Sequence, residues 1–341
     1  MRVVHVHRIG GIGGSERHLL TLLPALADRG VDVRFVGLDD PSRAPDPFYA
    51  ALTVPSVRLR APRDVDPALA WRVRRALRGA DVVHTHLVHA DLYGALGARR
   101  LVSTKHNDDP FRAGPFRLVE RALARRAARV IVITEALARF QVERVGLPEA
   151  KLEVIHYGLD EVPRAWGTNP PDRVPPDVPV LLCVCRLEPQ KGVDVAIGAL
   201  SEVPDAHLVV LGEGPQRAEL ERLRDERVHL LGRVPDVAAW LRRADVLVHP
   251  VRWEGFGLAV LEAMLAGLPV VATNVSSLPE LLGDAGVLVP PNDASALAAA
   301  VNRVLGGPGD LAERGRARAR AEFSVARMAD RTLAVYESAS R

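Results

Sequence analysis

The stretch VLVHPVRWEGFGLAVLEAMLA, residues 246–266, places a short apolar strand, a loop and a helix in immediate succession. Val246 to His249 has the apolar character of a buried strand, and Leu258 to Ala266 predicts a helix. A second apolar run, Pro269 to Ala272, follows after a glycine. Strand, helix and strand in this order are typical of a parallel sheet covered by helices.

The same alternation extends in both directions along the 341-residue chain. In the second half, further apolar runs lie at Val180–Cys185, His207–Leu211 and Val228–Leu230. In the first half they lie at Val3–His7, Val31–Leu38, Val82–His84, Leu101–Thr104 and Val130–Thr134. The sequence therefore predicts an α/β fold with two doubly wound, parallel-sheet, Rossmann-like domains.

A proline-rich segment separates the two halves. Residues 163–179 contain six prolines and little periodic hydrophobicity, so we expect a linker there. It would join an N-terminal domain of residues 1–162 to a C-terminal domain of residues 180–318. Residues 319–341 are helical in pattern, and we expect this helix to pack back on the N-terminal domain. Ligands of open α/β sheets bind at the carboxyl ends of the strands, so we expect the two domains to face a central cleft.

Composition limits the classes to which the protein can belong. Hydrophobic residues make up 48% of the chain and charged residues 26%, which is typical of a globular protein. No apolar run approaches the roughly 18 residues that span a bilayer. The strand pattern begins directly after Met1, without the features of a signal peptide, and we expect a cytoplasmic protein.

The net charge of +3 does not indicate a nucleic-acid partner. Residues 1–165 hold 26 basic and 19 acidic side chains, so the positive excess is confined to the first half. Only three of the 45 basic residues are lysine, which indicates the coding bias of a GC-rich genome rather than a binding partner. The two cysteines, Cys183 and Cys185, are too few for a disulfide framework or a zinc site.

Two carboxylates flank the loop and the helix start of the opening stretch. Glu254 precedes Gly255 and Gly257, and Glu262 lies one or two turns into the helix. The glycines let a ligand approach the backbone, and the N–H groups at a helix N-terminus favour an anion or a hydroxyl-rich group. A helix start that is merely stabilised by acidic residues explains the pattern equally well.

Two cations follow a predicted buried strand earlier in the second half. Arg186 comes directly after Val180–Cys185, and a turn brings Lys191 to the start of the next helical segment. Cations at a strand end suit a diphosphate leaving group, on which negative charge grows as its bond breaks. Because lysine is rare in this chain, Lys191 favours this interpretation over two solvent-exposed cations beside a loop.

Seven sequence elements along the chain occur together in one known family. They are GGSE (13–16), VHTH (83–86), TKHN (104–107), VIHYGLD (154–160), the pair Arg186 and Lys191, GEGP (212–215) and Glu254–Glu262. In content and order they resemble the retaining glycosyltransferases of family 4, which have the GT-B fold. The resemblance covers essentially the whole chain. It implies an acceptor-binding N-terminal domain and a C-terminal domain that binds a nucleotide-sugar donor.

The resemblance implies a role for each matching residue. Arg186 and Lys191 would hold the donor diphosphate, Glu262 the ribose hydroxyls and Glu254 the hydroxyls of the donor sugar. His106 matches the histidine beside the transferred sugar, and with Arg186, Lys191 and Glu254 it forms the expected catalytic set. The other implied donor contacts are Gly13, Gly14, Arg233, Val234, Gly255, Phe256, Gly257 and Leu258. The acceptor-side candidates are Glu16, His84, His86, Lys105, His106 and Asn107.

The implied reaction transfers a hexose-type sugar, with retention, from a nucleoside diphosphate sugar to a hydroxyl of a small molecule, a glycan or a lipid. UDP is the commonest nucleotide in the family and is favoured. Arg186 and Lys191 can neutralise the negative charge of the diphosphate in place of a metal ion, so we expect no metal and no other cofactor. The chain departs from the common family pattern at His156-Tyr157 and at Asn107, and both departures concern the acceptor side.

Five histidines of the first half present a metal site as an alternative: His5, His7, His84, His86 and His89. His84 and His86 are two residues apart on a predicted strand, so their side chains project to one side and could share a ligand. No acidic or thiol partner is expected nearby, and polar residues are ordinary at strand ends beside a cleft. We therefore expect no metal here.

Residues Arg112–Arg129 predict a basic amphipathic helix. The segment holds six arginines among apolar residues. Such a face can lie on an anionic membrane and bring the protein to a lipid acceptor, which would make the protein membrane-peripheral. An arginine-rich face that only contacts water explains the pattern as well.

Three other functions compete with glycosyl transfer. A dehydrogenase fingerprint needs glycines at positions one, three and six, but counting from Gly11 the sixth position is Glu16. A sugar-nucleotide epimerase of the same overall fold would not be expected to contain Glu254–Glu262. A non-catalytic nucleotide-sugar-binding protein is left open by the sequence.

Overall fold

The computed structural model describes residues 1–40, 47–63, 65–107, 114, 117–160 and 174–340. The chain folds into two compact units. Unit 1 comprises Met1–Gly158 and Ser324–Arg341, and unit 2 comprises Leu159–Phe323. Residues 163–173 of the expected linker lie outside the described residues, and residues 174–179 lead directly into the first strand of unit 2.

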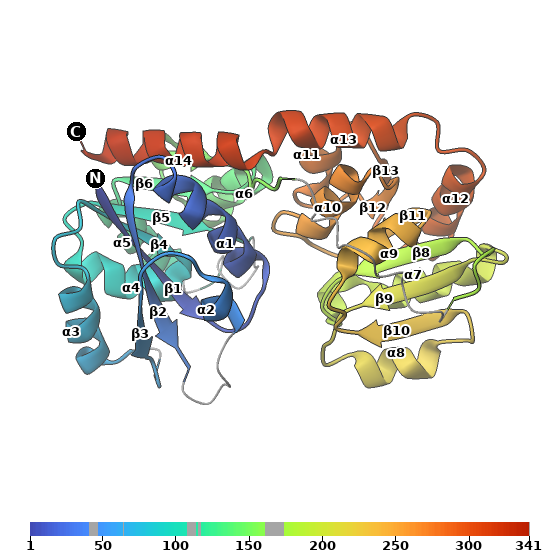
Figure 1. The fold of residues 1–341 in the computed structure, drawn as a ribbon, viewed down its shortest axis with the longest axis horizontal. Helices are drawn as coiled ribbons and strands as arrows, with labels where there is room; N and C mark the ends of the chain where they lie inside the picture. Colours follow the sequence, from blue (N-terminus) through green and yellow to red (C-terminus); the bar gives the residue numbers. More distant parts are fainter. Residues whose placement is uncertain (41–46, 64, 108–113, 115–116, 161–173, 341) are drawn as a thin grey trace. The chain divides into compact units, whose positions relative to one another are not determined.

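Unit 1 contains a seven-stranded parallel sheet in the order β3-β2-β1-β4-β5-β6-β7 (Figure 1). Its strands are β1 (Arg2–Ile9), β2 (Asp32–Asp39), β3 (Ser56–Arg60), β4 (Val82–His86), β5 (Leu101–Lys105), β6 (Arg129–Val132) and β7 (Leu152–Val154). Its helices are α1 (Gly14–Ala27), α2 (Pro47–Ala51), α3 (Pro67–Ala76), α4 (Leu87–Gly97), α5 (Arg117–Arg126), α6 (Glu135–Phe140) and α14 (Val325–Ser340).

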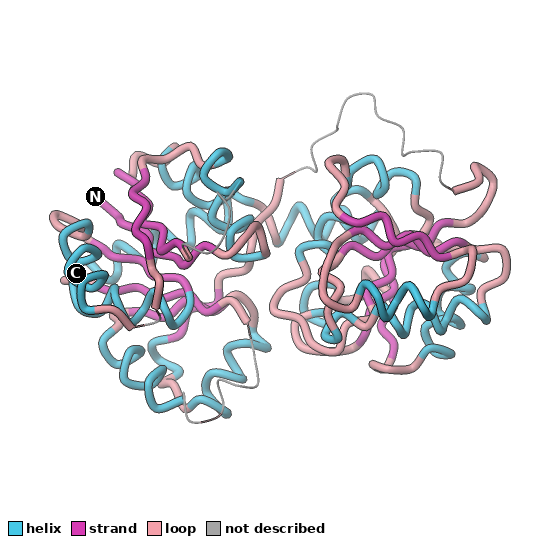
Figure 2. Tube along the Cα trace, turned by 90° about the horizontal axis from the view of Figure 1, so that it is seen from below, coloured by secondary structure: helices cyan, strands magenta, loops and turns pink. Residues whose placement is uncertain are grey.

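The core of unit 1 has two layers, one on each face of the sheet, because successive side chains of a strand point to opposite faces. Val3 packs on one face with residues of α1 and α14, including Leu22 and Tyr336. Val4 packs on the other face with residues of α3 and α4, including Tyr93. Helices therefore cover both faces, as Figure 2 shows, and the central strands are buried along nearly their whole length.

Unit 2 repeats this architecture with a six-stranded parallel sheet in the order β10-β9-β8-β11-β12-β13. Its strands are β8 (Val180–Val184), β9 (His207–Leu211), β10 (Val228–Gly232), β11 (Val246–His249), β12 (Val270–Thr273) and β13 (Val287–Val289). Its helices are α7 (Val193–Ala199), α8 (Arg217–Leu223), α9 (Val237–Arg243), α10 (Leu258–Ala266), α11 (Leu278–Leu282), α12 (Ala294–Leu305) and α13 (Leu311–Glu322). The prediction of two doubly wound parallel sheets is confirmed.

The strand order reverses direction once in each sheet. In unit 1 the chain builds outward from β1 through β2 and β3 and then returns to place β4 on the other side of β1. In unit 2 the same reversal places β11 beside β8. At such a point the two loops that follow the neighbouring strands diverge to opposite faces and leave a crevice at the carboxyl edge, which is where ligands of these folds bind.

The C-terminal segment differs from the single helix predicted over residues 319–341. Phe323 leaves the helical conformation with φ −121° and ψ 36°, which ends α13 within unit 2. A second helix, α14, follows at once, and the hydroxyl of Ser324 accepts a hydrogen bond from the N–H of Arg327 in its first turn. Only α14 belongs to unit 1.

The basic segment predicted as a helix over Arg112–Arg129 is helical only as α5 in the part that the structure describes, and most of residues 112–116 lies outside that part. Arg129 is the first residue of β6, because Ala128 is already held to the neighbouring strand through the carbonyl of Leu101. The prediction that the helix extends to Arg129 is therefore wrong. Leu118 and Val119 are exposed on α5, and none of the described helices has the length and apolarity needed to cross a membrane.

Candidate active site

At the strand-order reversal of unit 2, a largely buried ion pair joins the loops that follow β8 and β11. Lys191 ends a one-turn helix after β8, and Glu254 lies in the loop between β11 and α10. Lys191 Nζ donates to Glu254 Oε2 at 2.7 Å, and the two side chains are only 12% and 13% exposed. His249, the last residue of β11, places its Nε2 3.1 Å from the same oxygen. A cation, a carboxylate and an imidazole thus meet where the strand order reverses.

The surroundings of Glu254 keep its carboxylate ionised. Burial alone would raise its pKa, but the positive charge of Lys191 and the hydrogen bond from His249 outweigh burial and lower the pKa below its usual value. The N–H of Gly255 donates to Oε1 at 3.0 Å. An ionised carboxylate has about four acceptor positions, and these three partners leave room for a hydroxyl donor from a ligand.

Two glycines allow the loops after β8 and β11 to adopt their shapes. Gly192 has φ +63°, and a Cβ at this position would lie 2.0 Å from the carbonyl oxygen of Pro250, so the loop after β8 contacts the end of β11 directly. Gly257 has φ +98° and precedes α10. The hydroxyl of Ser277 ties the loop down by donating to the carbonyls of Glu254 and Phe256.

The other predicted donor residues of unit 2 lie in the segments after β8 and β10 and in the loop and helix that follow β11. Arg186 is 65% exposed and pairs with Glu188 at 2.7 Å. Glu262 is 5% exposed and lies on α10. Arg233 and Val234 follow β10 at the edge of the sheet, while Gly255, Phe256, Gly257 and Leu258 form the loop and first turn before Glu262.

In unit 1, the loop after β1 is held by Glu16. Gly13 and Gly14 stand at the start of α1, and the carboxylate of Glu16 accepts from the N–H of Gly13 and the hydroxyl of Ser15, both at 3.0 Å. His7 Nε2 lies 3.3 Å from the other oxygen. Burial would raise the pKa of Glu16, but the interactions with His7 and these donors lower it. Glu16 therefore stabilises the loop.

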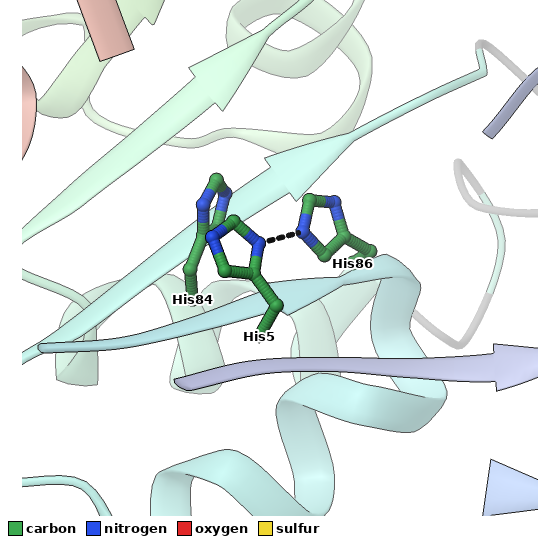
Figure 3. Close-up of side chains that lie close together, drawn as sticks. All are labelled: His5, His84 and His86. Carbon is green, nitrogen blue, oxygen red and sulfur yellow. Dashed lines mark hydrogen bonds between the residues drawn. The ribbon is translucent and has the colours of Figure 1, made fainter. Parts of the chain in front are cut away.

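Three histidines of unit 1 lie together on neighbouring strands. His5 on β1 is paired in register with His84 on β4, and His86 projects from the same face of β4 two residues later. Figure 3 shows the three rings together, with the hydrogen bond of 3.0 Å between His5 Nδ1 and His86 Nε2. One nitrogen of each ring lies within 4.8 Å of the others, and all three side chains are fully buried. His5 thus joins the pair that the spacing predicted.

His106 is placed beside this cluster. It directly follows β5, its Nε2 lies 3.0 Å from His86 Nδ1, and its Nδ1 is hydrogen-bonded to the hydroxyl of Tyr157. Lys105 points to the other face of the sheet, where its ammonium contacts Asp91 at 2.6 Å and both groups are 1% exposed. The ammonium of Lys105 is therefore held in the core rather than offered to an acceptor. Asn107 follows at the edge of the described residues.

Comparison with known proteins assigns the family. Residues 12–162 match the model described as Glycosyltransferase Family 4, and residues 178–306 match Glycosyl transferases group 1. Glycogen synthase of Mycobacterium tuberculosis is 31% identical, over 97% of this chain and 92% of its own length. The chain belongs to glycosyltransferase family 4. D-inositol 3-phosphate glycosyltransferase of Mycobacterium bovis is 32% identical to this family 4 protein, over 76% of this chain and 62% of its own length.

Solved structures similar to this family 4 glycosyltransferase have the GT-B fold. HepE of Anabaena, in complex with UDP, superposes with a TM-score of 0.85 at 22% identity and covers 99% of this chain and 100% of its own. Sucrose-phosphate synthase from Thermosynechococcus elongatus gives a TM-score of 0.82 at 24% identity and 98% coverage of both chains. The predicted GT-B fold is confirmed.

Several residues of this glycosyltransferase that contact predicted site residues were themselves absent from the predicted site. In unit 2 they are His249 and Ser277, and in unit 1 they are His5, Asp91, Thr104, Tyr157 and Tyr336. His249 ends an apolar strand five residues before Glu254, and a polar residue at a strand end was a usable signal. Tyr336 offered none, because its contacts depend on how α14 docks.

Proposed function

We propose that this protein is a retaining glycosyltransferase that moves a hexose from a nucleoside diphosphate sugar to a hydroxyl of a small molecule, a glycan or a lipid. The cluster of Lys191, Glu254 and His249 at the strand-order reversal of unit 2 is the observation that most strongly supports it. Unit 2 would bind the donor and unit 1 the acceptor. A cleft between the two units stays a prediction.

In this proposal each residue near the donor acts through its charge. Lys191 would face the diphosphate and stabilise the negative charge that develops on the leaving group. Glu254, ionised and with acceptor capacity left, would accept a hydroxyl of the donor sugar. Arg186, which is exposed, would leave Glu188 to add a second positive charge, and Glu262 would accept the ribose hydroxyls. The UDP complexes of HepE favour UDP as the nucleotide.

The reaction would proceed on one face of the sugar. The bond between the anomeric carbon and the β-phosphate oxygen breaks, the acceptor oxygen bonds to the same carbon from the same side, and the acceptor proton passes to the departing phosphate oxygen. Because Lys191 and Arg186 supply positive charge at the diphosphate, we propose that transfer needs no metal ion. His106 would lie beside the transferred sugar from unit 1.

We also propose that α5 contacts an anionic membrane when the acceptor is a lipid. The exposed residues Leu118 and Val119 lie on the same short helix as the exposed Arg117 and Arg125. Apolar side chains that enter the interface together with arginines that meet lipid phosphates are typical of helices that lie on membranes.

The donor proposal is tested by Lys191→Ala in the full chain. Thermal-shift screening with a panel of nucleotide sugars identifies the donor, and mass spectrometry with candidate acceptors measures transfer. We expect the variant to transfer at least about tenfold more slowly, because one charge at the leaving phosphate is lost. Arg222→Ala, which removes an exposed cation from α8, serves as the control and should transfer at the rate of the unaltered protein.

Three outcomes contradict the proposal. Near-normal turnover of the Lys191→Ala variant would remove that residue from the donor site. A change in sugar configuration without any acceptor would indicate an epimerase. Tight donor binding with transfer to none of the acceptors and no release of the nucleotide would indicate a non-catalytic binding protein.

A further inference from the structure

An unbroken series of hydrogen bonds runs through the buried face of unit 1, and it links four histidines to two tyrosines and a threonine. We call these seven residues the histidine network. In order they are Thr104, His84, Tyr336, His5, His86, His106 and Tyr157. They come from β5, β4, α14, β1 and the segments after β5 and β7, so the sheet, the loops and the C-terminal helix all contribute.

Every bond of the network joins side-chain atoms. His84 Nε2 lies 2.6 Å from Thr104 Oγ1, and His84 Nδ1 lies 2.6 Å from Tyr336 Oη. Tyr336 Oη is also 3.2 Å from His5 Nε2. From His5 Nδ1 the series continues to His86 Nε2 at 3.0 Å and from His86 Nδ1 to His106 Nε2 at 3.0 Å. It ends at the hydrogen bond between His106 Nδ1 and Tyr157 Oη.

Burial keeps the imidazoles at the centre of the network uncharged. His5, His84 and His86 are 0% exposed. Burial, and then the charge of His18, lowers the pKa of His5 to about 3. The pKa values of His84 and His86 are lowered well below the usual value by burial and by the neighbouring histidines. A neutral imidazole has one N–H donor and one acceptor nitrogen.

This rule couples the proton positions along the whole series. If Tyr336 donates to His5 Nε2, the proton of His5 must sit on Nδ1, and the same follows for His86 and then for His106. Tyr336 must then accept from His84, whose proton is also on Nδ1. If Tyr336 instead donates to His84, every step reverses and each of the four rings carries its proton on Nε2. With all four rings neutral and the hydroxyl of Tyr336 donating to one of them, no arrangement that mixes the two tautomers satisfies all of the bonds.

We propose that the histidine network holds His5, His84, His86 and His106 in one common tautomer, and that Tyr336 is the positioning residue that joins His84 to the other three. The C-terminal helix thereby fixes the ring of His106 through His5 and His86. A consequence for catalysis rests on the proposed function, in which His106 lies beside the transferred sugar. The tautomer coupling itself does not depend on that function.

A metal held by His5, His84 and His86 is the competing explanation of the cluster. Each of their six ring nitrogens already has a hydrogen-bond partner in the protein. A metal ion would have to displace the hydrogen bond between His5 and His86 and one partner of His84. Hydrogen bonds satisfy the buried rings as they stand, so the network is the simpler interpretation.

The test uses full-length protein labelled with ¹⁵N-histidine, whose ring nitrogens report the tautomer of each histidine by NMR. Signals are assigned with single His→Gln variants. We expect all four rings of the network to be neutral and to share one tautomer near neutral pH. Tyr336→Phe keeps the aromatic ring in the core and deletes only the hydroxyl. In that variant the ring ¹⁵N chemical shifts of His106 should move toward the values expected for a mixture of the two tautomers.

Controls separate the network from general damage to the fold. Tyr49→Phe deletes a hydroxyl of unit 1 that bonds to Asp39 outside the network and should leave the His106 signals unchanged. If Tyr336→Phe does not fold, Thr104→Val, which removes only the end partner of His84, provides the same readout. In the active enzyme we expect Tyr336→Phe to lower kcat on the order of tenfold through misplacement of His106, with KM for the donor unchanged.

Distinct results overturn the proposal. The proposal fails if the four rings of the unaltered protein are found in different tautomers. It also fails if the ¹⁵N chemical shifts of His106 are the same in Tyr336→Phe as in the unaltered protein. Stoichiometric metal that survives dialysis and is lost from His84→Gln would replace the network with a metal site. If the unaltered protein transfers no sugar, the proposed function fails, and the NMR result still decides the network.

Discussion

Four buried histidines should make unit 1 sensitive to mild acid. His5, His18, His84 and His86 are each at most 7% exposed. Burial is the largest cause that lowers the pKa of each below the ordinary value of 6.5, for His5 and His18 to about 3. In the unfolded chain the same groups bind protons near their ordinary pKa. Folding therefore opposes the protonation of these histidines. The free energy of unfolding that unit 1 has above pH 6.5 decreases as the pH falls below 6.5.

The size of the effect follows from this linkage. Between pH 7.5 and pH 5.5, one histidine that stays neutral only in the folded state lowers the free energy of unfolding by about 1.4 kcal/mol. Four such groups lower it by about 5.5 kcal/mol, which is comparable with the roughly 5 to 15 kcal/mol that stabilise a typical domain. Unit 1 should thus lose a large part of its stability between pH 7.5 and pH 5.5.

Urea unfolding at the two pH values, followed by pulse proteolysis and mass spectrometry, measures each unit separately through its own peptides. His18→Phe is the matched variant, because His18 stacks on Tyr157 with ring centroids 4.4 Å apart and phenylalanine keeps a flat ring without a titratable group. The pH-dependent loss in this variant should be smaller by about 1.4 kcal/mol. Equal stability of unit 1 at both pH values would refute the reasoning, and so would an unchanged pH dependence in His18→Phe.

Two further predictions concern charged groups of unit 1. Asp91→Asn leaves the ammonium of Lys105 buried without its counter-charge and should cost about 3 to 5 kcal/mol of unfolding free energy. Adding Lys105→Met should recover part of that loss in urea unfolding, and no recovery would contradict the assignment. On α5, Arg117→Glu with Arg125→Glu should weaken binding to anionic vesicles by about 1 kcal/mol per arginine removed. Cosedimentation measures this, with Arg222→Glu on α8 as the control, and equal binding of both variants would exclude α5.

The sequence was sufficient to predict those features of the site that depend on the order of strands and loops along the chain. Lys191 and Glu254 each follow an apolar run, and parallel strands bring the segments after their carboxyl ends to one edge of the sheet. Their meeting also required β8 and β11 to be neighbours, which the doubly wound pattern implies. Lys191 and Glu254 were therefore predictable as a pair, whereas the contact of His249 with the same carboxylate depends on the path of the loop.

Contacts that depend on how strands and helices pack together could not be predicted from the spacing of residues in the sequence. His5 and His84 are far apart in the sequence, and only the register of β1 on β4 brings them together. Tyr336 reaches both because α14 lies across β4 and β5. The break at Phe323 was missed because helical composition continues through it, although Ser324 is a residue type that commonly begins a helix.

The assignment of α14 to unit 1 has a consequence for synthesis on the ribosome. Residues 159–323 form a complete unit inserted into another, and the inserted unit has all of its strands and helices once Phe323 is made. Unit 1 begins first but lacks Met328 and Tyr336 from its core until α14 emerges. The domain made first is therefore finished last, and a nascent chain halted before α14 would hold a folded unit 2 beside an open unit 1.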